Sequence, residues 1–407
     1  MNGKIINDPV YGFIQFKEPE LMQIINHPWF QRLRGIKQMG MAQFVYPGAV
    51  HTRFHHSLGA THLMGIALQQ LQQKQVEISD RECIGARQAI LMHDIGHGPF
   101  SHALEKTLIQ NVSHEDISLQ IMHTLNQEFD GQLDIALSIF QHQHPKHFLH
   151  QLVSSQLDTD RMDYLTRDSF FSGVTEGNIG YDRILQMLTV VDNELAIEEK
   201  GIFSVEKFIV ARRLMYWQVY LHKTVLGSEK LIVRILKRAK ELANKGIQLF
   251  ASPALQFFLY NHIDRNDFLS HPSVLEEFCR LDDGDITIAI KVWSTHQDEI
   301  LATLCKMFIT RQLYKVKLTT ESVNDDYERL KKQGYESGIL NEENESYYVF
   351  TGIAKNNTYK SNDEKICISL KNGLIKDISD IDNALISRNV AVEIKKQYLC
   401  YIPRLKY

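Results

Sequence analysis

Hydrophobic and polar residues follow two different patterns along the chain. From about residue 20 to residue 245, apolar positions recur every three or four residues, which is the spacing of amphipathic helices. Two helix starts are explicit, because Ser79-Asp80-Arg81-Glu82 is a capping-box sequence and Ser113 precedes another helical segment. An apolar stripe behind Ser228 consists of Ile232, Ile235, Leu236, Ala239 and Leu242.

The pattern changes after about residue 310. Residues 346–352 and 365–371 have the composition of strands, and the polar stretch 355–358 between them indicates a turn. A chain of 407 residues is long enough for two or three compact units. We therefore predict a mainly α protein. It has a helical core over residues 1–250 and a smaller region over residues 251–407 that is first helical and then α+β.

Composition narrows the class of protein. Lys and Arg number 45 against 49 Asp and Glu, and this net charge of −4 argues against nucleic acid as the main partner. The five cysteines form no Cys-x-x-Cys pair, which is typical of reduced thiols in the cytoplasm. The chain opens on no apolar leader and has no apolar run of 18 residues, so we predict a cytoplasmic protein without a membrane span.

Histidine is concentrated in one part of the chain, since 13 of the 18 lie between residues 51 and 150. The central motif is the pair His93-Asp94, followed closely by His97 and His102. An imidazole nitrogen beside a carboxylate oxygen suits a divalent cation such as Zn, Mn, Fe, Ni or Mg. The alternative is a buried histidine held by its acidic neighbour.

Two further segments favour the metal. Residues 51–59 add the pair His55-His56 upstream of the central motif. Residues 158–168 add carboxylates downstream, and a helix there would place five polar side chains on one face: Asp160, Asp163, Tyr164, Arg167 and Asp168. The alternative is a solvated charged face. Residues 154–165 contain no lysine or glutamate, the commonest residues of such faces, which argues against that alternative.

These motifs, taken together, resemble those of the HD-domain phosphohydrolases, and within them the deoxynucleoside triphosphate (dNTP) triphosphohydrolases. The resemblance runs in order through residues 4–9, 30–34 and 46–51 to the segments above, and it reaches about Lys223. It implies an HD-domain helical core. It also implies one divalent ion held by His56, His93, Asp94 and Asp160, with His55 as a bystander.

The resemblance further implies a reaction. Water attacks the α-phosphorus of a dNTP, and the products are deoxynucleoside and inorganic triphosphate. His114 occupies the position of the general acid, and Glu105 and Glu115 are candidates to orient it. Arg53, His97 and His102 would face the α-phosphate and the departing oxygen.

Other positions of the resemblance imply substrate contacts. They are Gln38 and Met39 for the nucleoside, Arg161 and Arg212 for phosphates, and Tyr164, Asp168 and Tyr220 for the sugar or base. Asp168 would accept a hydrogen bond from the 3′-hydroxyl. The helix predicted around residues 205–225 places Arg212, Tyr216, Tyr220 and Lys223 within one stripe. Such a stripe is also typical of simple amphipathic packing.

Relatives in this family bind an activating guanine nucleotide near the N-terminal segment and assemble into dimers or tetramers. The matching positions here are Lys4, Asn7, Asn26, Gln31 and Arg34. Asn26 stands where the relatives have an aspartate. An asparagine cannot accept from both guanine donors, so we expect a nucleotide activator pocket with altered base preference, or none.

Two other functions stay open at this point. One is a different HD-type phosphohydrolase, a nucleotidase or phosphodiesterase that uses the same ion. The other is a protein without catalysis that senses nucleotides or binds single-stranded nucleic acid. The intact set of four metal ligands argues against the second, because a pure sensor does not need all four.

Overall fold

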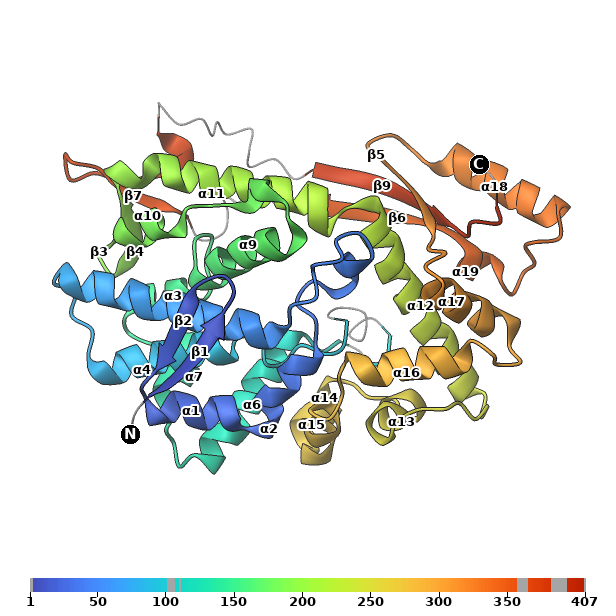
Figure 1. The fold of residues 1–407 in the computed structure, drawn as a ribbon, viewed down its shortest axis with the longest axis horizontal. Coiled ribbons are helices and arrows are strands. Elements are labelled where there is room, and N and C mark those ends of the chain that lie inside the picture. Colours follow the sequence, from blue (N-terminus) through green and yellow to red (C-terminus); the bar gives the residue numbers. More distant parts are fainter. Residues whose placement is uncertain (1–2, 101–106, 110, 357–364, 382–393, 406–407) are drawn as a thin grey trace.

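The protein is described here by a computed structural model that covers residues 3–100, 107–109, 111–356, 365–381 and 394–405. It is mainly α, as predicted, with a helical core and small sheets (Figure 1). None of the helices in the described ranges is long and apolar enough to cross a membrane. All five cysteines are free thiols.

The N-terminal segment forms a hairpin that the sequence pattern did not predict. Strand β1 (Lys4–Asp8) pairs antiparallel with β2 (Gly12–Phe16). The carboxylate of Asp8 holds the turn, because its Oδ1 accepts from the backbone N–H groups of Val10 and Tyr11 at 2.9 and 3.0 Å. Two short helices follow, α1 (Pro19–Asn26) and α2 (Pro28–Gln31).

Two long helices and three shorter ones form the first part of the core: α3 (Arg53–Gln73), α4 (Asp80–Met92), α6 (His114–Glu128), α7 (Asp134–Phe140) and α8 (His147–Val153). Both predicted helix starts are confirmed. The hydroxyl of Ser79 accepts from the N–H of Glu82, whose carboxylate accepts from the N–H of Ser79. Ser113 and Asp116 form the same reciprocal cap at the start of α6.

The second part of the core includes the helices α9 (Thr159–Ser172), α10 (Tyr181–Gln186), α11 (Ile202–Met215) and α12 (Lys223–Asn244). The prediction of one helix around 205–225 is wrong. Helix α11 ends at Met215, and a π-helical turn over residues 216–220 separates it from α12. The predicted stripe on α12 is confirmed, since all five of its apolar residues are buried.

Two sheets involve the C-terminal region. Strands β5 (Lys315–Thr319), β9 (Ile394–Tyr401) and β6 (Val349–Asn356) form an antiparallel sheet in that order. A second sheet has the order β3 (Leu188–Val191), β4 (Glu194–Glu198), β7 (Cys367–Ser369), β8 (Ile375–Asp377). Strand β7 pairs parallel with β4, so part of the C-terminal region returns to the core, where Figure 1 shows it near β4.

Both predicted strand segments contain a strand, although residues 346–348 belong to the short helix α19 (Glu345–Tyr348) that precedes β6. The remaining helices of this region are α13 (Pro253–Tyr260), α14 (Arg265–Ser270), α15 (Pro272–Phe278), α16 (Asp283–Trp293), α17 (Glu299–Ile309) and α18 (Asn324–Glu336). Helix α12 packs against both α17 and β5, and it thereby joins the core to the C-terminal region.

Candidate metal centre and its cavity

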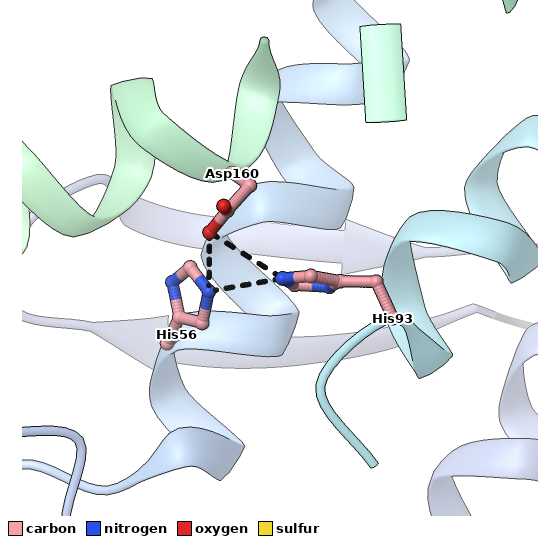
Figure 2. A group of neighbouring side chains, drawn as sticks. All are labelled: His56, His93 and Asp160. Atoms are coloured by element: carbon pink, nitrogen blue, oxygen red, sulfur yellow. Dashed lines mark hydrogen bonds and ion pairs between the residues drawn. The ribbon is translucent and has the colours of Figure 1, made fainter. Parts of the chain in front are cut away.

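Three side chains from three segments point toward one another in the core (Figure 2). His56 lies in the first turns of α3, His93 directly follows α4, and Asp160 lies in the first turn of α9. Asp160 Oδ1 is 3.0 Å from His56 Nε2 and 3.4 Å from His93 Nε2, and the two Nε2 atoms are 3.4 Å apart. These atoms are close enough for one ion to contact all three.

The other nitrogen of each histidine is already engaged. His93 Nδ1 donates to the carbonyl oxygen of Ile90 at 2.6 Å, and His56 Nδ1 donates to Asp163 Oδ2 at 2.8 Å. In the neutral rings, therefore, the lone pairs are on the Nε2 atoms, and they face the Asp160 carboxylate. Lone pairs and a carboxylate repel one another unless a cation lies between them, so the donor set fits a divalent metal ion.

Asp163 is itself held by a buried ion pair. Arg167 donates to both of its carboxylate oxygens at 3.0 Å and to Asp8 Oδ2 at 2.8 Å. The helical spacing of residues 160–168 predicts Asp163 and Arg167 on the same face as Asp160. The structure divides that face, because Asp160, Tyr164 and Asp168 line a cavity whereas Asp163 and Arg167 turn into the core behind His56.

The electrostatics of the group favour a cation. Burial disfavours the protonated form of His56, but hydrogen bonds to Asp160 and Asp163 outweigh it and raise the pKa of His56 to about 10. The pKa of His93 is raised in the same way, against its burial, by Asp94 and Asp160. The carboxylates that attract protons to these rings would equally attract a metal ion.

Metal binding should therefore displace a proton. Because the pKa of His56 is raised to about 10, its ring carries a proton at pH 7 that must leave before Nε2 can bind an ion. We expect release of about one proton per Mn²⁺ or Zn²⁺ bound, and an apparent affinity that rises with pH below 10. Calorimetry in buffers of different ionisation enthalpy measures this, and binding without proton release would contradict it.

Asp94, the fourth expected ligand, borders this group. Its Oδ1 is 3.5 Å from His93 Nε2, and its Oδ2 is 3.7 Å from His56 Nε2. It also forms an ion pair with Arg53 and lies 3.3 Å from His97 Nε2. Asp94, His97 and His114 form a second group whose ligand atoms are close enough to share an ion.

His97 and His114 are stacked, with ring centroids 3.9 Å apart. His114 is the first residue of α6, so the serine cap of that helix sets its position. Burial and then the charge of Arg53 lower the pKa of His97 to about 3. His97 is therefore neutral at physiological pH.

A cavity of about 620 Å³ adjoins these groups. It contains eleven residues predicted from the sequence: Gln38, Met39, Arg53, Asp94, His97, His114, Asp160, Arg161, Tyr164, Asp168 and Tyr220. Asp168 accepts from the hydroxyl of Tyr220 at 2.7 Å, and the ring of Tyr164 lies 6.2 Å from that of Tyr220. Gln38 and Tyr220, which are 182 positions apart in the sequence, thus line one cavity.

Among the other predicted site residues, His56 and His93 belong to the metal group and do not line the cavity, and neither do Glu115 and Arg212. His102 and Glu105 lie outside the described residues. Glu115 is exposed and does not line the cavity, because consecutive helix residues point about 100° apart and His114 takes the inward direction. Arg212 is buried but donates to Gln156 Oε1 at 3.0 Å instead of lining the cavity. The π-helical turn changes the register after Met215, so Tyr216 and Tyr220 face the cavity without Arg212.

Sequence reasoning missed two charged residues of the wall, Glu229 and Lys230 on α12. Lys230 follows Lys223 by seven residues, which is two helical turns, so helical periodicity could have placed it on the same face as Lys223.

His55, the neighbour of His56, has a different role. It is the N3 residue of α3, where its Nδ1 accepts from the backbone N–H of Thr52 at 3.2 Å. Its ring is thus engaged at the helix start.

The residues expected to bind an activator lie away from this cavity. Lys4 and Asn7 are exposed on β1, and Asn26 is exposed at the end of α1. Gln31 Oε1 accepts from Arg34 Nε at 2.7 Å, and Gln31 Nε2 donates to the carbonyl oxygen of Ile25. The pair Gln31–Arg34 is therefore linked to the segment that carries Asn26.

Several known proteins are similar to this chain. Residues 53–168 match the HD domain, and residues 179–252 match the HD associated region. The chain is 30% identical to the uncharacterized protein YwfO of Bacillus subtilis over 98% of this chain and 92% of the relative. It is 51% identical to a phosphohydrolase of Bacteroides thetaiotaomicron, whose crystal structure matches with a TM-score of 0.94 over 98% of this chain and 99% of that chain.

Relatives of named activity are also similar. The deoxynucleoside triphosphate triphosphohydrolase SAMHD1 of Bos taurus is 30% identical over 82% of this chain and 61% of the relative. The SAMHD1 homolog of Dictyostelium discoideum is 32% identical over 61% of this chain and 52% of the relative. The matches thus leave a large part of both triphosphohydrolases uncovered.

Proposed function

Because the chain belongs to the HD-domain phosphohydrolases, we propose that it hydrolyses dNTPs to deoxynucleoside and inorganic triphosphate with one divalent metal ion. One observation carries the proposal. A single cavity is lined by Asp160 of the metal group, by three cations (Arg53, Arg161 and Lys230) and by the tyrosines and Asp168. Its volume of about 620 Å³ lies in the range of small-molecule sites.

His56, His93, Asp94 and Asp160 would hold the ion. When bound, it would polarise a phosphoryl oxygen and favour the ionised form of a water molecule. The hydrogen bonds from His56 to Asp163 and from His93 to Ile90 keep the Nε2 lone pairs directed inward. Zn, Mn, Fe, Ni and Mg all accept such mixed nitrogen and oxygen donors.

The three cations of the wall would bind the triphosphate. Arg53 is positioned by its ion pair with Asp94, and Arg161 by the hydrogen bond of its Nε to the carbonyl oxygen of Ser155 at 2.6 Å. A guanidinium presents a planar pair of donors to phosphate oxygens, whereas the ammonium of Lys230 adds a compact charge.

His114 would supply the proton of the reaction. A water oxygen attacks the α-phosphorus, the bond from phosphorus to the 5′-oxygen breaks, and His114 protonates that oxygen as it leaves. The neutral ring of His97 supports this role, because it stacks on His114 and adds no positive charge beside it. The products are a deoxynucleoside and triphosphate.

The sugar would lie among Tyr164, Tyr220 and Asp168, and the base near Gln38 and Met39. Asp168 would accept from a 3′-hydroxyl, and the ring of Tyr164, packed where a 2′-hydroxyl would lie, would favour deoxyribose. The long and flexible side chain of Met39 is no basis for tight base selectivity.

Product analysis with each of the four dNTPs and a defined metal tests the proposal. Inorganic triphosphate and deoxynucleoside in equal amounts support it. Release of orthophosphate or pyrophosphate would instead identify a nucleotidase or a different phosphohydrolase of the same family. Binding without any hydrolysis, at full metal occupancy, would favour a nucleotide sensor. Light scattering tests the expected dimer or tetramer.

GTP should activate this enzyme weakly or not at all. Asn26 offers a carbonyl oxygen and an NH₂ group, so one guanine donor would face another donor. Such an unpaired donor costs about 1–3 kcal/mol, or about 5- to 150-fold in affinity. Dose–response assays with and without GTP measure the effect, and Asn26→Asp should increase the response. Strong activation of the wild type that Asn26→Asp leaves unchanged would contradict this prediction.

A further inference from the structure

A buried histidine holds the carboxylate that we assign to the sugar. His51 is 2% exposed, and its Nε2 is 2.7 Å from Asp168 Oδ1. The hydroxyl of Tyr220 donates to the other oxygen of Asp168 at 2.7 Å. Asp168 and Tyr220 line the cavity, whereas His51 does not. His51 therefore contacts the sugar-binding carboxylate from behind, on the side away from the substrate.

The surroundings of His51 decide which ring nitrogen donates. Its Nδ1 is buried and has no hydrogen-bond partner among the described residues. A proton on that nitrogen would therefore be a buried, unpaired donor, which is costly. A proton on Nε2 is instead donated to Asp168 Oδ1, which lies 2.7 Å away. Each oxygen of the carboxylate accepts one hydrogen bond in this way and keeps a lone pair for a further donor.

The position of the ring is fixed by its neighbours. It stacks on Phe171 of α9, with centroids 4.5 Å apart and planes 20° apart. The backbone carbonyl of His51 accepts from the N–H of Gln38 at 3.0 Å. Gly48 allows the loop to lie against α9, since a Cβ there would be 2.5 Å from the carbonyl oxygen of Phe171. The loop that contains Gly48 and His51 thus packs directly against α9, the helix that carries Asp168.

We propose that His51 is a positioning residue that fixes the Asp168 carboxylate as the acceptor for the 3′-hydroxyl, and that it thereby makes the enzyme selective for substrates with this hydroxyl. The proposal rests on the proposed function. Without His51, the Asp168 side chain could rotate, and its hydrogen bond to the 3′-hydroxyl would weaken. Misplacement of a substrate-binding group by about 1 Å lowers the rate by up to about 100-fold. The competing explanation is a buried His–Asp pair that only stabilises the fold.

Substrate substitution separates the two explanations. His51→Phe keeps the ring on Phe171 but removes the donor, and His51→Gln keeps a donor of similar reach. We expect His51→Phe to lower kcat/KM for dATP about 10- to 100-fold, while the value for the 3′-deoxy analogue changes less than about threefold. His51→Gln should recover most of the preference for dATP. His150→Phe, a half-buried histidine outside the cavity, should leave both values unchanged.

Equal losses on both substrates would show a merely structural role and overturn the proposal, as would a wild type without preference for the 3′-hydroxyl. The affinities for a non-hydrolysable dATP analogue and its 3′-deoxy form give the same comparison without turnover. They therefore test the role of His51 even if product analysis refutes the proposed reaction. If His51→Phe does not fold, nitrogen NMR of the wild type decides. A protonated Nδ1 would overturn the proposal, and an Nε2–H tautomer, together with lost preference in His51→Asn, would support it.

Discussion

Replacing Asp160 by alanine is expected to remove the bound metal ion and to lower turnover by at least about 10³-fold, as for the loss of a preorganised charge at the reacting centre. Asp160 Oδ1 faces both His56 Nε2 and His93 Nε2, so its loss leaves two nitrogen donors without the charge that balances a cation. Metal analysis after gel filtration and steady-state assays measure both effects. Circular dichroism should show an intact fold, because Asp160 is partly exposed in the first turn of α9.

The adjacent pair His55-His56 supplies a matched control for the same site. His56→Ala should abolish metal binding as Asp160→Ala does. His55→Ala should cost only the contact of its ring with Thr52 at the start of α3, about 1 kcal/mol of stability, with metal content preserved. Retention of metal and turnover in Asp160→Ala, or equal loss from both histidine variants, would mean that the ligand assignment is wrong.

Removing His114, the proposed general acid, should have the second largest effect. His114→Ala is expected to lower kcat about 10²- to 10⁴-fold while KM changes little, since a proton donor acts only in the transition state. The loss should shrink for substrates whose leaving oxygen needs no proton, such as p-nitrophenyl esters. Steady-state kinetics with both substrate types measure this prediction.

His123→Ala is the control on the same helix, because His123 is exposed and lies nine residues further along α6. It should leave both kcat and KM unchanged. A rise in KM with unchanged kcat in His114→Ala would assign His114 to binding instead. Loss of metal in that variant would place it in the second group of potential ligands, with Asp94 and His97.

Several features of this protein could be predicted from its sequence because they depend on short distances along the chain. The caps at Ser79 and Ser113 need only a residue and its neighbour three positions on, and both are formed. The apolar stripe on α12 needs only helical periodicity. The motifs around His56, His93 and Asp160 could be read because each is local, and the resemblance to a family indicated that they meet.

Other features depend on contacts that no local pattern encodes. The π-helical turn after Met215 adds one residue per turn, so an α-helical projection placed Arg212 and Tyr220 on one stripe, whereas only Tyr220 lines the cavity. The pairing of β7 with β4 joins residues about 170 positions apart, and strand composition does not specify a partner.

The amino-acid sequence by itself therefore determined the helical class, the helix caps and the residue types that could hold a metal ion. Tertiary structure alone decided which side chains share the cavity. It turned Asp163 and Arg167 behind His56, brought Lys230 into the wall and placed His51 against Asp168. The physical reason is that helix caps and helical periodicity depend on residues a few positions apart. A buried charged side chain, in contrast, needs a hydrogen-bond partner within about 3 Å, and the packing of the core decides which distant residue supplies it.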